Sequence, residues 1–250
     1  MKIKGQRSWD YGFLSWDAAV AHAGRYDDDS IIKKVHASAR MVLDGHASYE
    51  RDSVIFNEIE YSWPLLAALL LAAATKNSLR VIDFGGSLGT TYRQNSCFLK
   101  RLSFACQWRV VEQEKFVEIG KNEFTNETLS FYCQIEDAIL DGVDVVLFGG
   151  SICYVEDPYK YLSDAIKVDA EYIIFDRTPI TLESKDTFAV QHVPSSIYKA
   201  SFPIRTFSQD NLIKTVGLRY ELVEKWICDL QADPKSTAMG FIFKRKFSNM

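Results

Sequence analysis

The sequence has little of what several protein classes require. Its five cysteines are odd in number and contain no C-x-x-C pair, which argues against a zinc knuckle and a closed disulfide framework. Its 29 basic residues are outnumbered by 33 acidic ones and form no dense cluster, which disfavours a nucleic-acid partner. The longest apolar run, residues 63–74, is too short to span a bilayer, and the first residues lack the apolar stretch of a signal peptide. We therefore expect a cytoplasmic protein with reduced cysteines and no membrane span.

The composition is typical of a folded protein. Of the 250 residues, 47% are hydrophobic and 25% are charged, and the net charge is −4. No fixed-period repeat or low-complexity tract is present, so solenoids and linker-joined arrays are disfavoured. The length suits one α/β domain with an appendage. The oligomeric state is left open.

The first third of the chain reads as helices, from residue 13 to residue 76. Apolar residues recur at helical spacing over 16–22 and 31–43. Ser62-Trp63-Pro64 supplies a cap and an early proline for a helix over 65–74, which is apolar all round and is therefore expected to be buried. A further helical stretch is expected over 53–58.

From residue 79 the pattern changes to short β-rich runs separated by helical stretches. Continuous apolar runs of this kind are typical of a parallel sheet that is covered on both faces. Two last runs have too short a connection for a crossover helix, so they predict an antiparallel hairpin. The prediction is an α/β fold with a Rossmann-like, seven-stranded, mostly parallel sheet. The predicted strands cover 79–84, 108–112, 129–133, 144–148, 171–175, 221–228 and 239–244.

The most informative motif is Val-Ile-Asp-Phe-Gly-Gly-Ser-Leu-Gly at residues 81–89. There an apolar strand runs into a glycine-rich turn and then into a helix. Glycines let the backbone approach a ligand closely, and open α/β sheets bind ligands at the carboxyl ends of their strands. The alternative is a tight turn without a ligand. The motif predicts a cofactor site that includes Asp83, Gly85, Gly86, Ser87 and Gly89.

An acidic residue, Glu112, ends the second strand of the predicted parallel sheet. A carboxylate there can accept hydrogen bonds from both ribose hydroxyls of a nucleotide, although the spacing exceeds the usual value of about 20 residues. Glu136, after the third of these strands, is a candidate partner for an adenine amino group. For both residues, the alternative is an acid that is simply exposed to solvent.

These motifs resemble those of the class I S-adenosylmethionine-dependent methyltransferases. Residues 83–89 are similar to the superfamily's D-x-G-x-G-x-G loop, with Ser87 in place of the middle glycine. Residues 144–159 are similar to its fourth-strand segment, and the terminal hairpin matches its topology. The resemblance implies that S-adenosyl-L-methionine is the cofactor.

The resemblance also implies roles for individual residues. The glycine loop would surround the methionine moiety, with Glu112 on the ribose and Gln113 beside the adenine. Ser151 and Tyr154 would lie under the sulfonium and face the acceptor. Turn packing is an equally good reading of these last two residues.

A narrower resemblance covers almost the whole chain. It is to a family of predicted methyltransferases found among bacterial surface-polysaccharide and glycan biosynthesis genes. This family is named mainly from its fold, so the resemblance implies the cofactor more than the acceptor. The segments that carry it are YERDSVIF (49–56), YSWPLLAALL (61–70), DFGGSLGTTYRQN (83–95), VVEQEKFVEIGK (110–121), FDRTPI (175–180) and VQHVPSSIYKASFP (190–203).

Candidates for the acceptor side lie between the fifth and sixth predicted strands. A sugar hydroxyl is a poor nucleophile at neutral pH and benefits from a positioned base. His192 is the leading candidate because histidine titrates near neutral pH, and Asp176 and Tyr198 are alternatives. Arg177 is a candidate to bind an anionic acceptor group, and Gln191 is a further acceptor contact. The alternative is that Arg177 only neutralises a neighbouring acid and that Asp176 only forms an ion pair with Arg177 or another cation. A histidine that only stabilises its loop is the competing reading of His192.

The predicted function is transfer of a methyl group from S-adenosylmethionine to an oxygen of a sugar or sugar-linked small molecule in bacterial glycan biosynthesis. The alternatives are a non-catalytic cofactor-binding or partner protein and, less favoured, a nicotinamide-dependent oxidoreductase. No metal is expected, because the remaining histidines show no ligand spacing with acids. The predicted organisation is an N-terminal helical extension or cap (1–76) and a methyltransferase domain (77–250) with a substrate-cap insertion (177–215).

Overall fold

The structure is a computed structural model that describes residues 8–24, 29–194, 197, 200–228 and 234–246. The strands are β1 (Ser8–Phe13), β2 (Tyr49–Arg51), β3 (Val54–Phe56), β4 (Leu79–Phe84), β5 (Cys106–Val111), β6 (Leu129–Tyr132), β7 (Val145–Gly149), β8 (Tyr172–Thr181), β9 (Thr187–His192), β10 (Ser201–Ser208), β11 (Tyr220–Ile227) and β12 (Thr237–Arg245). The α-helices are α1 (Trp16–Val20), α2 (Asp29–Leu43), α3 (Trp63–Lys76), α4 (Thr90–Leu99), α5 (Glu114–Ile119), α6 (Pro158–Lys167) and α7 (Gln209–Val216). Shorter helical turns are η1 (Gly120–Phe124), η2 (Glu136–Ala138) and η3 (Ile152–Tyr154).

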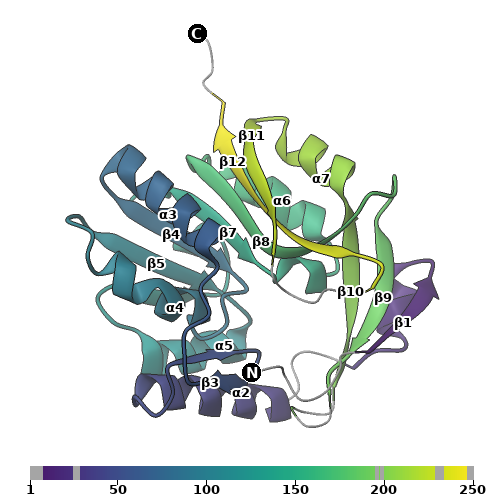
Figure 1. Ribbon diagram of the computed structural model, residues 1–250, viewed down its shortest axis with the longest axis horizontal. Helices are drawn as coiled ribbons and strands as arrows, with labels where there is room; N and C mark the ends of the chain where they lie inside the picture. Colours follow the sequence, from purple (N-terminus) through teal and green to yellow (C-terminus); the bar gives the residue numbers. More distant parts are fainter. Residues whose placement is uncertain (1–7, 25–28, 195–196, 198–199, 229–233, 247–250) are drawn as a thin grey trace.

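One large sheet organises the molecule (Figure 1). Its ten strands include the path β1-β9-β10-β8-β7-β4-β5-β6, while β12 pairs with β8 and β11 pairs with β12. β2 and β3 form a separate two-stranded sheet. All seven predicted strands are confirmed, but the predicted count of seven is wrong because β1, β9 and β10 extend the sheet.

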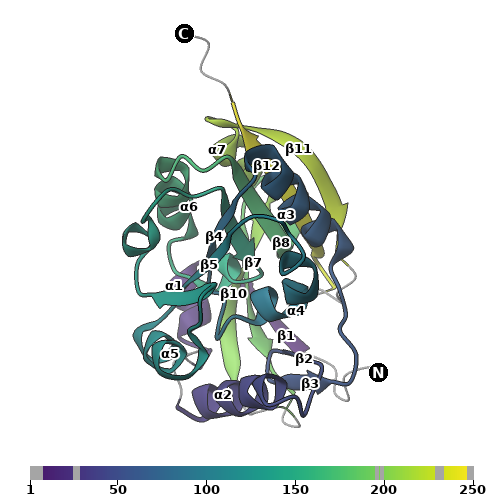
Figure 2. The ribbon, with the colours of Figure 1, turned by 90° about the vertical axis from the view of Figure 1, so that its left-hand side faces the viewer.

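The centre of the sheet is parallel and buried on both faces. β4 pairs in parallel with β5 and β7, β5 with β6, and β7 with β8. Val81 packs into a core that includes apolar residues of α2 and α3, whereas its neighbour Ile82 packs into a core that includes residues of α6 and α7. Figure 2 shows α3 and α4 on one side of these strands and α6 and α7 on the other. The predicted α/β sheet with helices on both faces is confirmed.

The chain ends with the predicted antiparallel hairpin. β12 pairs antiparallel with β11 on one side and with β8 on the other, where Ile242 lies opposite Ile174. This arrangement places β12 between the parallel part of the sheet and the outer strand β11.

Of the five strands that the sequence did not predict, β1, β9 and β10 lie together. β9 pairs antiparallel with β10 and with β1. β10 alternates between partly exposed and buried residues along most of its length and contains Pro203. It therefore lacks the continuous apolar run that marks the central strands, and proline also disfavours a strand prediction.

β8 changes its partner midway along its length. It is parallel to β7 up to the pair of Asp176 with Gly149, and from Ile180 onward it is parallel to β10. Between these two parts its register with β12 shifts, and Arg177 has a left-handed φ of 55°. This bulge lets β9 and β10 continue beyond the carboxyl end of β7, where they form one wall of the site (Figure 1).

The predicted helix over 53–58 is wrong. β2 and β3 form an antiparallel hairpin whose two-residue turn is Asp52-Ser53. Both turn residues have positive φ, 51° and 65°, as a tight hairpin of the right twist requires. This turn has no glycine, so the usual sequence signal for such a hairpin is missing.

α3 is correctly placed in sequence, but it is not buried all round. Trp63 is 60% exposed and Leu71 46% exposed, whereas Leu65 and Leu69 are buried. The Ser62 side chain does not cap the helix but donates a hydrogen bond to Asp176 Oδ1 at 3.2 Å. By contrast, Asp157 caps α6, accepting from the backbone N–H of Lys160 at 3.1 Å.

No helix within the described ranges is long and apolar enough to cross a membrane. In the same ranges, no group of three or more His, Cys, Asp or Glu side chains is placed to hold a metal ion.

Candidate functional site

A cavity of about 610 Å³ lies at the carboxyl ends of β4, β5 and β7. This volume is within the range of small-molecule sites, roughly 300–1,000 Å³. The turns that follow these strands make the floor of the cavity. β9 and β10 make one wall, and the β2–β3 hairpin makes another. Open α/β sheets bind ligands at this edge, where helices begin and backbone N–H groups are accessible.

The glycine loop after β4 forms the floor of the cavity, where Gly85, Gly86 and Ser87 line it. Gly85 has a φ of 67°, and a Cβ at this position would lie 2.8 Å from Ser151 Oγ. A Cβ at Gly86 would lie 2.5 Å from Asp83 Oδ2. Glycine is therefore required at both positions by close packing. Ser87 has a φ of 53°, which a short polar side chain tolerates better than a bulky one.

Gly89 lies at the end of this loop but is not among the lining residues. It has a φ of 89° and directly precedes α4 as its N-cap residue. This backbone conformation turns the chain into α4. The first two residues of the helix, Thr90 and Thr91, line the cavity.

Glu112 projects into the cavity just after β5. Its Oε2 accepts from the Gln113 backbone N–H at 2.8 Å, and its Oε1 accepts from the Ser87 backbone N–H at 3.3 Å. These contacts tie the carboxylate to the glycine loop. Burial raises the pKa of Glu112 to about 7, while the two backbone hydrogen bonds act in the opposite direction.

Asp83 lies directly beneath the glycine loop and is fully buried. Its Oδ2 accepts from Trp108 Nε1 at 2.9 Å, while no described residue donates a hydrogen bond to Oδ1. Burial raises the pKa of Asp83 to about 6, although the Trp108 hydrogen bond and the charge of Arg177 act in the opposite direction. The residue supports the floor and carries a carboxylate oxygen that lacks a donor.

The end of the cavity beyond Glu112 is the place where an adenine contact was predicted. Gln113, Cys133, Gln134 and Ile135 line it. The predicted adenine contact Glu136 is in η2, is exposed, and is not among the lining residues. The structure therefore brings Gln113 to this end but leaves Glu136 outside it.

The turn after β7 connects the floor to the opposite wall. The Ser151 hydroxyl donates to the Phe84 carbonyl at the end of β4. Tyr154 lines the cavity from η3, and its hydroxyl donates to Gln191 Oε1 on β9 at 2.8 Å. The predicted residues Ser151, Tyr154 and Gln191 are thus brought together around one cavity.

Asp176 and Arg177 form an ion pair at the bulge in β8, with 3.2 Å between Asp176 Oδ2 and Arg177 Nε. Arg177 lines the cavity and donates from Nη2 to the Gly149 carbonyl at 2.7 Å. Asp176 is 1% exposed and is not among the lining residues. Arg177 therefore borders the cavity, while Asp176 is buried outside the lining and forms an ion pair with it.

His192 is not brought to the cavity. It ends β9 between Gln191 and Val193, which both line the cavity, and side chains alternate along a strand. Its Nε2 lies 2.7 Å from Asp10 Oδ2 on β1, so its visible contact is with the neighbouring edge strand. Tyr198, the other predicted base, lies outside the described residues.

The sequence did not assign the β2–β3 hairpin to the site. Glu50, Arg51, Asp52 and Ser53 line the cavity. Glu50 is only 3% exposed; it accepts from the Thr90 hydroxyl, and its Oε1 lies 3.7 Å from Arg93 Nη2. Burial raises the pKa of Glu50, and the Thr90 hydrogen bond and Arg93 act against this shift. The polar cluster at residues 49–52 is the available signal for a roof over the pocket, but its residue types favour an ordinary salt-bridged helix face.

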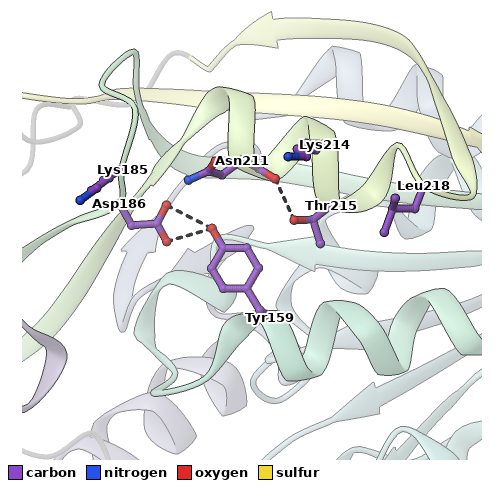
Figure 3. A pocket seen from close by; sticks show the side chains of 7 residues that line it. All are labelled: Tyr159, Lys185, Asp186, Asn211, Lys214, Thr215 and Leu218. Carbon is purple, nitrogen blue, oxygen red and sulfur yellow. Dashed lines mark hydrogen bonds between the residues drawn. The ribbon is translucent and has the colours of Figure 1, made fainter.

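A second groove, of about 540 Å³, lies between α6 and α7 (Figure 3). Its one carboxylate, Asp186, accepts from the Tyr159 hydroxyl at 2.9 Å, from Arg205 Nη1 at 3.2 Å and from the Ser208 backbone N–H at 2.9 Å. These donors already satisfy Asp186, and the groove contains no glycine loop. Its side chains are therefore explained by packing of the two helices.

No protein-family model and no curated protein sequence matches this chain. Solved structures do resemble it. The N-terminal domain of EvdMO1, determined in the presence of S-adenosylhomocysteine and D-fucose, is 16% identical; the TM-score is 0.50, and the match covers 89% of this chain and 100% of that one. A Listeria monocytogenes protein described as an S-adenosylmethionine-dependent methyltransferase is 10% identical, with a TM-score of 0.51 and coverage of 74% and 98%. Burkholderia thailandensis 1,6-didemethyltoxoflavin-N1-methyltransferase is 13% identical, with a TM-score of 0.48 and coverage of 99% of each chain.

The fold is that of the class I methyltransferases. At such low sequence identity the likeness concerns the fold alone. The prediction of a Rossmann-like, methyltransferase-type sheet is confirmed, whereas the acceptor and the gene context are not addressed by these matches.

The packing of the glycine loop predicts a specific loss of stability. Gly85→Ala should lower the free energy of unfolding by roughly 2–4 kcal/mol, because the new methyl group meets Ser151 and the residue must keep a positive φ. Gly45→Ala is a matched control: Gly45 has a φ of 76° but nothing lies within 4 Å of the added Cβ, so about 1 kcal/mol is expected. Urea denaturation measures both. Equal losses would show that the contact with Ser151 is not tight.

Proposed function

We propose that this chain is an S-adenosylmethionine-dependent methyltransferase. The observation that carries the proposal is that the glycine loop and Glu112 lie in one cavity and are tied together by the Ser87 N–H to Glu112 contact. The EvdMO1 domain, which shares the fold, was determined in the presence of S-adenosylhomocysteine, which supports the same cofactor here.

The residues present suit this cofactor. Glu112 offers a carboxylate to two ribose hydroxyls, and Gln113 and Ile135 lie where the adenine would extend. Gly85 and Gly86 let the loop pack tightly against Ser151 and Asp83, so that backbone without side chains borders this part of the cavity. The cofactor supplies a methyl group that positive sulfur already activates. This chain holds the donor and acceptor in line and excludes water.

We propose that the acceptor is a hydroxyl of a sugar or sugar-linked small molecule of the kind used in bacterial glycan biosynthesis. The EvdMO1 domain, determined in the presence of D-fucose, supports a sugar. The wall opposite the glycine loop also suits one, since it combines aromatic surface from Tyr154 and Phe202 with the Gln191 amide. Aromatic faces stack on sugar rings, and amides bind hydroxyls.

Glu50 is the carboxylate that we propose as proton acceptor for the acceptor hydroxyl. It lines the cavity, whereas Asp176 is covered by Arg177 and His192 contacts Asp10. Burial raises the pKa of Glu50 above its ordinary value, which brings a carboxylate closer to the basicity that proton transfer at neutral pH requires. Thr90 and Arg93 fix its position.

One observation favours the alternative of a cofactor-binding protein without turnover. Neither of the two described residues that the sequence offered as bases, His192 and Asp176, lines the cavity. Incubation of the protein with radiolabelled S-adenosylmethionine and a panel of nucleotide-linked sugars separates the two functions. Label transferred to a sugar supports the enzyme; tight cofactor binding with no transfer to any acceptor supports the alternative.

Glu112 predicts a pH dependence of cofactor binding. The ionised carboxylate accepts from the ribose hydroxyls, and its pKa of about 7 means that acid neutralises it in the unliganded protein. S-adenosylhomocysteine affinity should therefore fall as the pH drops below 7, by at most tenfold per pH unit. Calorimetric titration between pH 6 and pH 8 measures it.

Glu112→Gln provides the control for this titration. The variant keeps Asp83, whose pKa of about 6 contributes its own pH dependence, so the difference between the two proteins isolates Glu112. At pH 8 the variant should bind at least tenfold more weakly, about 1.4 kcal/mol. Parallel pH profiles for the two proteins would contradict the ribose role.

Cys133 is predicted to report cofactor occupancy. It is exposed and lines the adenine end of the cavity, whereas the partly buried Cys97 is not among the lining residues. S-adenosylhomocysteine should slow alkylation of Cys133 by iodoacetamide at least fivefold and leave Cys97 unchanged, as peptide mass spectrometry measures. Unchanged alkylation of Cys133 at saturating ligand would place the adenine elsewhere.

Glu50→Gln is predicted to lower turnover at least tenfold with any acceptor that the screen identifies, because the amide cannot take the proton. S-adenosylhomocysteine affinity should stay within threefold, since the amide oxygen still accepts from Thr90. The matched control is Glu171→Gln, because Glu171 is also a buried glutamate, it pairs with Lys76, and neither residue is among the lining residues. Equal turnover in all three proteins would remove Glu50 from the reaction.

A further inference from the structure

The outer face of α3 carries no charge. The sequence has no charged residue from position 63 to position 75, and Figure 2 shows α3 on the outside of the molecule. A surface helix normally has charged side chains on its outer face, as α6 has in Lys160 and Lys167. The exposed residues of α3 up to position 74 are Trp63, Pro64, Ala67, Leu71 and Ala74. A helix that is apolar all round is typical of a protein interior, so another surface is expected to cover this face.

The exposed side chains form a row that is large, small and large in turn. Ala67 lies at the centre, and Trp63 and Leu71, which are 60% and 46% exposed, lie about one turn to either side of it. Residues spaced by four form the ridges through which helices most often pack, and a small central residue lets two helices approach closely. The row has the same order of sizes in both directions. It therefore suits an antiparallel copy of itself, in which each Trp63 meets Leu71 of the second copy.

The exposed ring of Trp63 is already held by its own chain. Its centroid lies 4.9 Å from that of Tyr61 and 5.9 Å from that of Phe98. A side chain that is ordered before binding loses little conformational entropy when a partner covers it. Trp63 is therefore suited to anchor a contact between two proteins, a role in which tryptophan is enriched.

Charges beyond the two ends of the row favour an antiparallel arrangement. Glu58 and Glu60 are exposed just before α3, and Figure 2 shows their segment running on from the N-terminal end of the helix. Lys76 ends the helix; it pairs with Glu171 at 3.4 Å and is still 42% exposed. Antiparallel copies bring each Lys76 toward the acidic segment of the other copy and oppose the two helix dipoles favourably. Parallel copies would bring the acidic segments together.

We propose that a second copy of this chain covers the outer face of α3, with a two-fold axis at Ala67. The two helices pack antiparallel, and each Trp63 lies against Leu71 of the second copy. None of the residues of this face lines the cavity, so the inference goes beyond the proposed function and does not depend on it. A contact made mainly by one pair of helices is small, so we expect a dissociation constant of roughly micromolar size.

Sedimentation velocity of the unaltered protein, from about 1 μM to about 200 μM, tests the dimer. We expect the mass to rise from that of one chain to that of two. Leu71→Arg should raise the dissociation constant at least tenfold, because it puts a charge into the contact; the variant should fold, since the position is exposed and arginine is a good helix former. Leu182→Arg is the matched control, because Leu182 is 86% exposed and lies outside α3. A single chain at every concentration, or equal dissociation constants for the two variants, would overturn the inference.

Two cysteine variants on the same face locate the axis. In the proposed dimer the two copies of Ala67 meet, whereas the two copies of Ala74 lie about 21 Å apart, since each is seven residues from the axis at about 1.5 Å per residue. A disulfide needs Cα atoms within about 7 Å. Mild oxidation should therefore link the two copies of Ala67→Cys and not those of Ala74→Cys, as peptide mass spectrometry measures. A link in the Ala74 variant, or in neither variant, contradicts the arrangement.

A lipid surface is the competing occupant of an apolar face. The net charge of −4 and the acidic segment before α3 disfavour a surface of anionic lipids. Co-sedimentation with vesicles of phosphatidylcholine and phosphatidylglycerol provides the comparison, and we expect the protein to stay in solution. Binding to vesicles that Leu71→Arg abolishes, by a protein that sediments as one chain, would show that lipid covers this face and would overturn the dimer.

Discussion

The site depends on the close packing of the glycine loop after β4 against the turn after β7. Gly85 has no room for a side chain beside Ser151, and the Ser151 hydroxyl donates to the carbonyl of Phe84. Beneath them, Asp83 is fixed by Trp108. This packing makes a floor of backbone, which a ligand can approach closely.

The second constraint is the change of partner in β8. A strand that stayed with β7 would end at the floor, but the bulge at Arg177 carries β8 past it and onto β10. β9 and β10 therefore stand beside the cavity and contribute Gln191 and Phe202 to its lining. The same bulge brings the Arg177 guanidinium over Gly149. One local distortion thus builds the wall that faces the glycine loop and supplies a charged group to the floor.

The parallel core, the glycine loop and Glu112 could be predicted because their signals are local: continuous apolar runs, a glycine-rich motif and an acid at a strand end. β1, β9 and β10 could not, since they pair across long stretches of sequence and have partly exposed faces. Because β9 was not predicted, the sequence did not show that neighbouring side chains on this strand point to opposite sides. Gln191 points into the cavity, whereas His192 points toward β1. The β2–β3 hairpin was missed because its left-handed turn, Asp52-Ser53, contains no glycine.

A crystal structure of the protein with S-adenosylhomocysteine tests the account most directly, because it shows the ligand's orientation along the whole cavity. We predict the ribose hydroxyls on Glu112, the adenine between Gln113 and Ile135, and the methionine moiety beside the glycine loop after β4. A ligand bound in the groove between α6 and α7, or bound in this cavity with its adenine above Gly149, would contradict the account.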